Sequence, residues 1–102
     1  MPSKSRPKTI TRDPNWLGPA IAPGEVLVEE FLKPLELGQV EAARRLEISL
    51  NRLNEIVLSK RGITADTALR LARLLKTSPQ FWMRLQADWD LHQAVARAAK
   101  AS

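Results

Sequence analysis

The apolar residues of the chain recur every three or four positions from residue 23 onward, in short segments separated by polar breaks. This spacing places the apolar side chains along one face of an α-helix. No segment alternates apolar and polar residues with the period of two that marks a half-buried strand. The pattern therefore predicts an all-α fold.

The first predicted helix covers about residues 23–33. Pro23 suits its first turn, where a missing N–H costs nothing, and Pro34 loosens its end. Its apolar positions are Leu27, Val28, Phe31, Leu32 and Leu35. Two shorter helices follow, at about 39–46 and 50–58, and Ser49 is a favourable N-cap for the second of them. Their predicted inward faces are Val40, Ala42, Ala43 and Leu46, and then Leu53, Ile56 and Val57.

Two further helices complete the pattern. Thr64 caps a helix whose apolar stripe is Ala65, Ala68, Leu69, Ala72 and Leu75. Ser78 and Pro79 then begin a last helix, at about 79–99, which ends in an Ala-rich stretch. Within it, Phe81, Trp82 and Leu85 are predicted core residues, Trp89 is a candidate for a dimer surface, and His92 is expected on the surface.

Residues 1–22 contain four prolines and lack the helical periodicity of residues 23–102, so they are expected to form an extended basic arm. Residues 23–102 are expected to form one domain, since 102 residues suit one domain and no more. Three roles are open for the arm: it enters a minor groove, it wraps a protein partner with Trp16 as an anchor, or it is a solubilising tail.

The composition excludes several classes of protein. The absence of Cys and the single His exclude disulfide frameworks, thiolate zinc sites, cysteine nucleophiles and His-rich metal sites, so no metal or cofactor is expected. No Gly-rich phosphate loop or nucleophile elbow occurs, and no catalytic residue is predicted: the chain is not expected to be an enzyme. It has no membrane-spanning apolar run or secretory signal, and the expected location is the cytoplasm.

The net charge of +5 is divided into blocks of opposite sign. Residues 1–12 carry +4, residues 13–36 carry −4, residues 37–76 carry +4 and residues 77–102 carry +1. A basic block of this kind suggests a polyanionic partner, although a solvated helical surface produces the same asymmetry.

Residues 39–58 have the length and pattern of a helix-turn-helix, in which the second helix enters the major groove of DNA. When Leu53 faces inward, Asn51, Asn54 and Glu55 face outward, with Arg52 at the edge. Amides read adenine, carboxylates read cytosine and guanidinium groups read guanine. Gln39, Lys60 and Arg61 are candidates for phosphate contacts, with Arg44 and Arg45 as weaker ones. The predicted DNA-binding residues are Gln39, Ser49, Asn51, Arg52, Asn54, Glu55, Lys60 and Arg61. The structural alternative is that this packing also occurs in all-α domains that bind no nucleic acid.

The chain resembles the HigA antitoxins of the XRE-type helix-turn-helix class over about residues 23–91. The residues that carry the resemblance are Pro23-Gly24-Glu25-Val26-Leu27, Phe31-Leu32-Lys33-Pro34-Leu35, Ala43-Arg44-Arg45-Leu46, Asn51-Arg52, Glu55-Ile56-Val57, Lys60-Arg61-Gly62-Ile63-Thr64-Ala65-Asp66-Thr67-Ala68-Leu69-Arg70-Leu71-Ala72, Thr77-Ser78-Pro79-Gln80-Phe81-Trp82 and Leu85-Gln86. The resemblance implies a five-helix, lambda-repressor-like domain, usually a homodimer. It also implies binding to a HigB-type, RelE-like ribonuclease toxin and repression of the antitoxin's own operon through operator DNA.

Six positions depart from the family pattern. Glu47 stands where a glycine usually permits a left-handed turn, and Leu50 replaces a polar or basic residue at the start of the recognition helix. The other departures are Gly38 for a Ser or Thr cap, Leu58-Ser59 for Asn-Gly, and Ala22 for a frequent His. Two other functions therefore stay open: a stand-alone XRE-type regulator without a toxin, and a toxin-neutralising module with little DNA binding. A basic toxin would suit the acidic first helix, with Glu25, Glu29 and Glu30.

Overall fold

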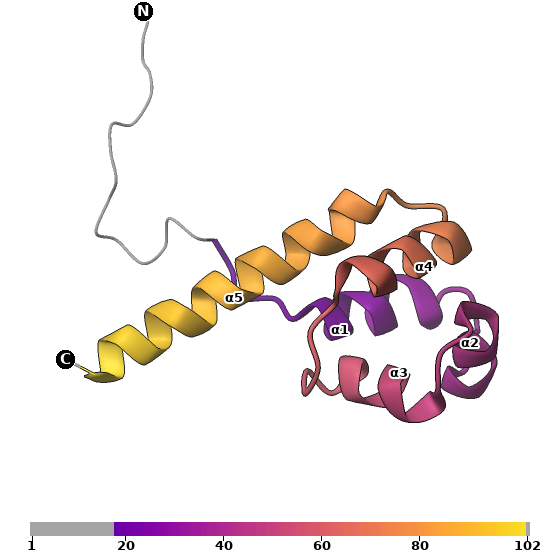
Figure 1. Cartoon of the computed structure of the whole chain (residues 1–102), viewed down its shortest axis with the longest axis horizontal. Helices are drawn as coiled ribbons and strands as arrows, with labels where there is room; N and C mark the ends of the chain where they lie inside the picture. Colours follow the sequence, from indigo (N-terminus) through magenta and orange to yellow (C-terminus); the bar gives the residue numbers. More distant parts are fainter. Residues whose placement is uncertain (1–17, 102) are drawn as a thin grey trace, which may run out of the picture.

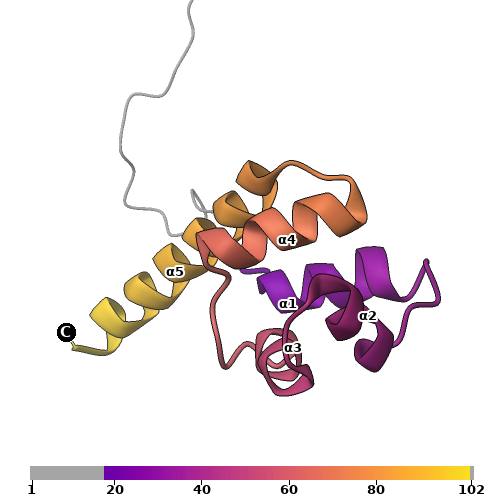
Figure 2. The same ribbon diagram turned by 45° about the vertical axis from the view of Figure 1, so that its right-hand side comes forward.

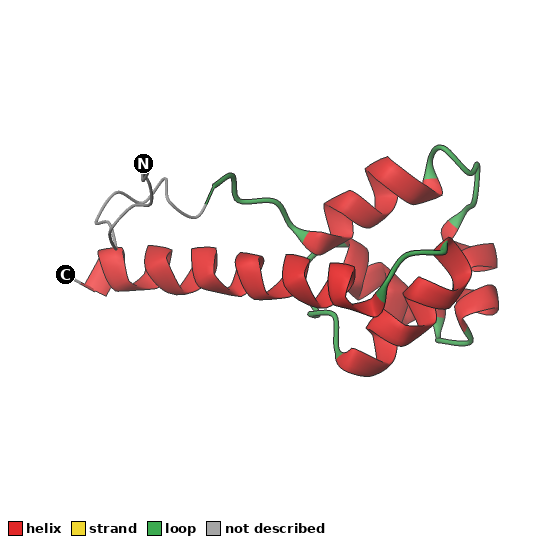
Figure 3. Ribbon diagram, turned by 90° about the horizontal axis from the view of Figure 1, so that it is seen from above, coloured by secondary structure: helices red, strands yellow, loops and turns green. Residues whose placement is uncertain are grey.

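The computed structural model describes residues 18–101. Its elements are α1 (Pro23–Val26), the π-helical η2 (Leu27–Leu32), α2 (Gln39–Leu46), α3 (Leu50–Val57), α4 (Ala65–Leu75) and α5 (Pro79–Ala101). The short helices form one cluster, and the far half of α5 projects from it as a straight rod (Figures 1 and 3). No strand occurs between residues 18 and 101, so the prediction of an all-α fold is confirmed. The arm up to residue 17 lies outside the described residues.

The predicted helix bounds agree closely with the structure, and the first helix shows one difference in its geometry. This helix ends at Leu32 and its second half is π-helical, with the N–H of Lys33 donating to the carbonyl of Val28 at 2.9 Å. Pro34 has no N–H to continue the helix. The caps at Ser49 and Thr64 are confirmed, since each side chain accepts a backbone N–H three residues later. No helix in the described part of the chain is long and apolar enough to span a membrane.

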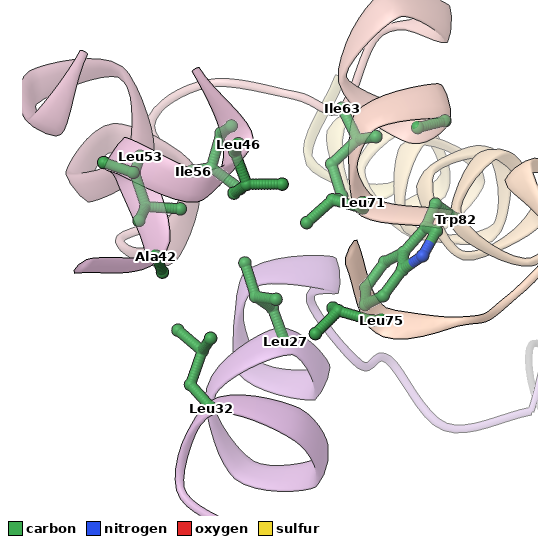
Figure 4. Packing of buried hydrophobic residues seen from close by; sticks show 12 residues of the cluster. Leu27, Leu32, Ala42, Leu46, Leu53, Ile56, Ile63, Leu71, Leu75 and Trp82 are labelled. Atoms are coloured by element: carbon green, nitrogen blue, oxygen red, sulfur yellow. The ribbon is translucent and has the colours of Figure 1, made fainter. Parts of the chain in front are cut away.

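Every element contributes to a single core (Figure 4). Leu27, Leu53, Leu71 and Trp82 are the most completely buried of its large side chains, at 1% exposure or less. They come from η2, α3, α4 and α5, so burying apolar surface holds these four elements together.

Several predicted inward positions are wrong, because Leu35, Val40, Ala65 and Leu69 are exposed. Val40 is 71% exposed and Leu69 is 52% exposed. Val40 is two residues from the buried Ala42, which on a helix is a rotation of about 200°. Leu71, two residues after Leu69 and on the opposite face of α4, is the leucine that is buried. Leu35 is exposed because the helix ends before it.

An aromatic cluster fastens α5 to η2. The indole of Trp82 is fully buried, and its Nε1–H donates to Thr77 Oγ1 at 2.7 Å. The rings of Phe31 and Phe81 lie 5.3 and 4.9 Å from it, centroid to centroid. The prediction that Trp82 is a core residue is confirmed, whereas Phe81 is exposed at the edge of the cluster and Leu85 is half-buried. Farther along α5, Trp89 is half-buried, and so is His92, which was expected on the surface.

Gly24 allows α1 to close against the end of α3. A Cβ at this position would lie 2.2 Å from the carbonyl oxygen of Ile56 and 2.8 Å from that of Val57. Both oxygens belong to the last turn of α3, which α1 contacts directly. Figures 1 and 2 both show α1 between α4 and α3. Any side chain at position 24 would therefore push these two helices apart.

We expect Gly24→Ala to lower the free energy of unfolding by about 1–3 kcal/mol, the usual effect of overpacking a close contact. Urea unfolding followed by circular dichroism measures this change. The matched control is Gly38→Ser, which also adds a Cβ but has no atom within 4 Å of it. Because Ser is a favourable N-cap for α2, the control should gain a few tenths of a kcal/mol. Equal stabilities for the two variants would contradict the close contact.

Candidate nucleic-acid interface

Helices α2 and α3 are joined by a tight turn at Glu47. This residue has φ 61° and ψ 42°, the left-handed conformation that glycine adopts most easily. The N–H of Ile48 donates to the carbonyl of Ala43 at 3.1 Å and closes the turn. The departure from glycine at Glu47 therefore leaves the turn intact, at a backbone cost of about 1 kcal/mol. Ser59, at the end of α3, is in the same conformation, with φ 62°.

The N-terminal ends of α2 and α3 share an exposed surface. A shallow hollow there is lined by Gln39, Val40, Leu50, Asn51 and Asn54. Asn54 Nδ2 donates to Gln39 Oε1 at 3.4 Å, so the two amides lie side by side across the two helices. Three of the predicted DNA-binding residues, Gln39, Asn51 and Asn54, are therefore brought together. We call this five-residue surface the amide hollow.

Arg52 points away from the amide hollow, toward α4. Its Nη2 donates to Asp66 Oδ2 at 2.9 Å and to Thr67 Oγ1 at 2.6 Å. Only 27% of its side chain is exposed. Ser49 is also engaged, because its Oγ accepts the backbone N–H of Arg52 at 3.0 Å. Ser49 and Arg52, two of the predicted DNA-binding residues, are thus used within the domain: Ser49 caps α3, and Arg52 joins α3 to α4.

The remaining predicted residues gather at the C-terminal end of α3. The carboxylate of Glu55 accepts from Arg61 Nε at 2.8 Å and lies 2.7 Å from Arg61 Nη2. Each of these two charges therefore offsets the other. Lys60 is exposed beside them and leaves a free positive charge at this end of the helix.

Asp66 and Arg70 were missed by the sequence analysis. Arg70 Nη1 donates to the carbonyl of Leu46 at 2.9 Å and to that of Glu47 at 3.3 Å, so it caps the C-terminal end of α2. Its Nε donates to Asp66 Oδ2 at 3.0 Å. One carboxylate oxygen thus holds Arg52 of α3 and the arginine that caps α2. We call Arg52, Asp66 and Arg70 the Asp66 clasp.

The sequence contains a signal for only half of this clasp. Asp66 and Arg70 are four residues apart on one helix, a spacing at which opposite charges pair. Arg52 is 14 residues from Asp66, and no local pattern indicates that contact. The hydrogen bonds from Arg52, and then those from Arg70, lower the pKa of Asp66. The carboxylate is therefore ionised wherever the domain is folded at ordinary pH.

Arg44 and Arg45, the weaker phosphate candidates, are held on the surface of α2. Both donate to the carboxylate of Glu41, with Arg45 Nε 2.8 Å from Glu41 Oε2. Hydrogen bonds from Arg44, and then from Arg45, lower the pKa of Glu41 to about 2. This exposed cluster is a surface network of two guanidinium groups and one carboxylate, which keeps a net positive charge.

Comparison with known proteins gives consistent matches. Residues 28–82 match the model of a family described as helix-turn-helix. Virulence-associated protein I of Dichelobacter nodosus is 51% identical over 76 residues, which are 74% of this chain and 70% of that protein. The antitoxin HigA of Pseudomonas aeruginosa, solved with the higBA promoter, is 43% identical with a TM-score of 0.77, over 81% of this chain and 90% of that one. The antitoxin GraA, solved in complex with its operator, is 37% identical with a TM-score of 0.74, over 81% of this chain and 84% of that one.

The Asp66 clasp predicts an acid sensitivity that Asp66→Asn should reduce. A carboxyl whose pKa is lower in the folded state stabilises the fold above its ordinary pKa of 3.8 and loses this effect as the pH falls below it. The wild-type urea midpoint should therefore fall more between neutral and strongly acid pH than the midpoint of Asp66→Asn. Asp88→Asn on α5, which removes an exposed carboxylate elsewhere, is the control and should fall as much as the wild type. Identical pH profiles for all three proteins would mean that the clasp contributes nothing to stability.

Proposed function

The chain belongs to the helix-turn-helix family of HigA-type antitoxins, and on this basis we propose that it represses its own operon through operator DNA and neutralises a HigB-type, RelE-like ribonuclease toxin. The matches confirm the resemblance that the sequence indicated. The relatives are helix-turn-helix regulators and antitoxins, and the proposed function includes no catalytic step. We place it in the cytoplasm, where such an operon is transcribed.

The amide hollow is the observation that carries the DNA half of this proposal. In a helix-turn-helix, the N-terminal residues of the second helix contact base edges, and the first helix crosses the backbone. Asn51 and Asn54 are exposed at that position of α3, and Gln39 begins α2, where free N–H groups favour phosphate. A homodimer would place two such surfaces in successive major grooves of a palindromic operator.

The other predicted residues take different roles in this proposal. Arg52 positions α3 through the Asp66 clasp, and Ser49 caps that helix. Lys60 contacts a phosphate at the end of α3, whereas Arg61 and Glu55 largely satisfy each other. Base reading then falls to the two asparagines.

The acidic side of the first helix supports the toxin half. Glu25, Glu29 and Glu30 are all exposed, and Lys33 is paired only with Glu29, at 2.9 Å, in this part of the chain. A basic toxin surface is complementary to these carboxylates. Toxin and operator would then occupy different surfaces of the domain. The part of the arm in residues 1–17 lies outside the described residues, and its role stays a prediction.

Two binding measurements on one preparation test the proposal. The first is a gel shift with DNA from upstream of the chain's own operon, and the second is co-purification with the product of the neighbouring reading frame. Binding to both supports the proposed function. Binding to DNA alone would identify a stand-alone regulator, and binding to the toxin alone would identify a neutralising module without repression.

We expect Lys60→Ala to reduce the slope of log affinity against log salt concentration by about 1, because one phosphate contact is lost. Operator affinity should fall to a similar degree for all DNA sequences. Lys100→Ala, at the far end of α5, removes the same charge away from the interface and should leave the slope unchanged. An unchanged slope for Lys60→Ala would remove this residue from the phosphate contacts.

Reversing the charge of the acidic surface should weaken toxin binding and spare DNA binding. The double variant Glu25→Lys with Glu30→Lys changes two exposed residues and leaves the Glu29–Lys33 pair in place. Calorimetry with purified toxin should show at least a tenfold loss of affinity, the result of placing like charges opposite each other. Asp88→Lys serves as the control for adding positive charge elsewhere. The predicted toxin surface is wrong if the double variant binds toxin as tightly as this control.

A further inference from the structure

Two exposed apolar side chains lie within the amide hollow. Val40 is 71% exposed and Leu50 is 46% exposed, and both line the hollow beside the three amides. Val40 is the second residue of α2, and Leu50 is the first residue of α3. Neither side chain belongs to the core of the domain. Leu50 is at the end of the second helix that contacts base edges in a helix-turn-helix, and Val40 lies beside it across the hollow.

The edges of DNA bases in the major groove offer one apolar group. Guanine, adenine and cytosine present hydrogen-bond donors and acceptors there, whereas thymine adds a C5-methyl group. Val and Leu side chains cannot hydrogen-bond to the polar edges, so a methyl group is the feature that they recognise. Asn side chains pair with N6 and N7 of adenine, which is the partner of thymine in the same base pair.

The residues that read guanine and cytosine are withdrawn from this surface. Arg52, the guanine reader by type, is held by Asp66 at 2.9 Å. Glu55, the cytosine reader by type, is held by Arg61 at 2.8 Å. The groups that stay exposed in the hollow are amide and apolar, and an A·T pair presents the complementary set of groups in the major groove.

We propose that the amide hollow is specific for A·T pairs, with Val40 and Leu50 receiving the C5-methyl group of a thymine in each half-site of the operator. This inference rests on the proposed function, because it names the base pair that the DNA surface selects. The Gln39–Asn54 contact joins α2 and α3 within the same hollow, beside the two apolar side chains.

The test is to replace each thymine of the operator in turn by deoxyuridine, which removes only the methyl group. The operator is first located by footprinting on DNA from upstream of the operon. One or two thymines in each half-site should show about a fourfold loss of affinity on replacement, the effect of losing one buried methyl group. Replacement at the other thymines should leave the affinity unchanged.

Variants then assign the effect to the hollow. In Leu50→Ala and Val40→Ala, the ratio of thymine to deoxyuridine affinity at the sensitive positions should approach 1. Leu58→Ala is the matched control, because this leucine is similarly exposed, at 53%, but follows α3 and does not line the hollow. It should keep the fourfold ratio. All three residues are exposed, and circular dichroism verifies that each variant is folded.

The possible outcomes separate this inference from the function on which it rests. If the wild type binds the operator but no deoxyuridine replacement changes the affinity, methyl recognition is wrong and repression stands. The same holds if the ratio is unchanged in Leu50→Ala and Val40→Ala. If the wild type binds no DNA from its own operon, the proposed repression fails, and methyl recognition fails with it.

Discussion

Helices of eight residues are not stable alone in water, and both α2 and α3 have this length. Their structure depends on the apolar surface that they bury together, around Leu53 of α3 and Leu27 of η2. Because the core holds these helices in place, their outer faces need not contribute to folding. The exposed side chains at the N-terminal ends of α2 and α3 are therefore free to serve binding, because the fold does not depend on them.

Local features of the sequence predict most of this fold. The bounds of α2 and the caps at Ser49 and Thr64 depend on neighbouring residues, and they were predicted closely. Part of the candidate site could be predicted for the same reason. Asn51 and Asn54 lie on the outer face of α3, as their helical spacing indicates. The inward turn of Arg52 could not be predicted, since it depends on where the fold places the beginning of α4, which brings Asp66 within reach of this side chain.

The folded domain pairs many of the charges that the sequence pattern shows as a basic block. Residues 37–76 contain eight cations, and ion pairs within the described part of the chain engage Arg44, Arg45, Arg52, Arg61 and Arg70. The carboxylates of these pairs lie in the same block, so its net charge of +4 is unchanged, but the pairing decides which cations are left without an acidic partner. Lys60 is the cation proposed to contact a phosphate, because it is exposed at the end of α3. The amide groups of the hollow carry no charge. The proposed base reading therefore uses neutral amide and apolar groups, whereas the charged groups are proposed to contact phosphates.

The approach of Gly24 to the last turn of α3 links two parts of the chain that are far apart in sequence. The chain enters the domain at the point where the recognition helix ends. The first turn of the domain therefore lies directly against the carbonyl groups of Ile56 and Val57. At this junction the two segments meet backbone to backbone, so the spacing between them is set by the absence of a side chain and not by any side chain that is present.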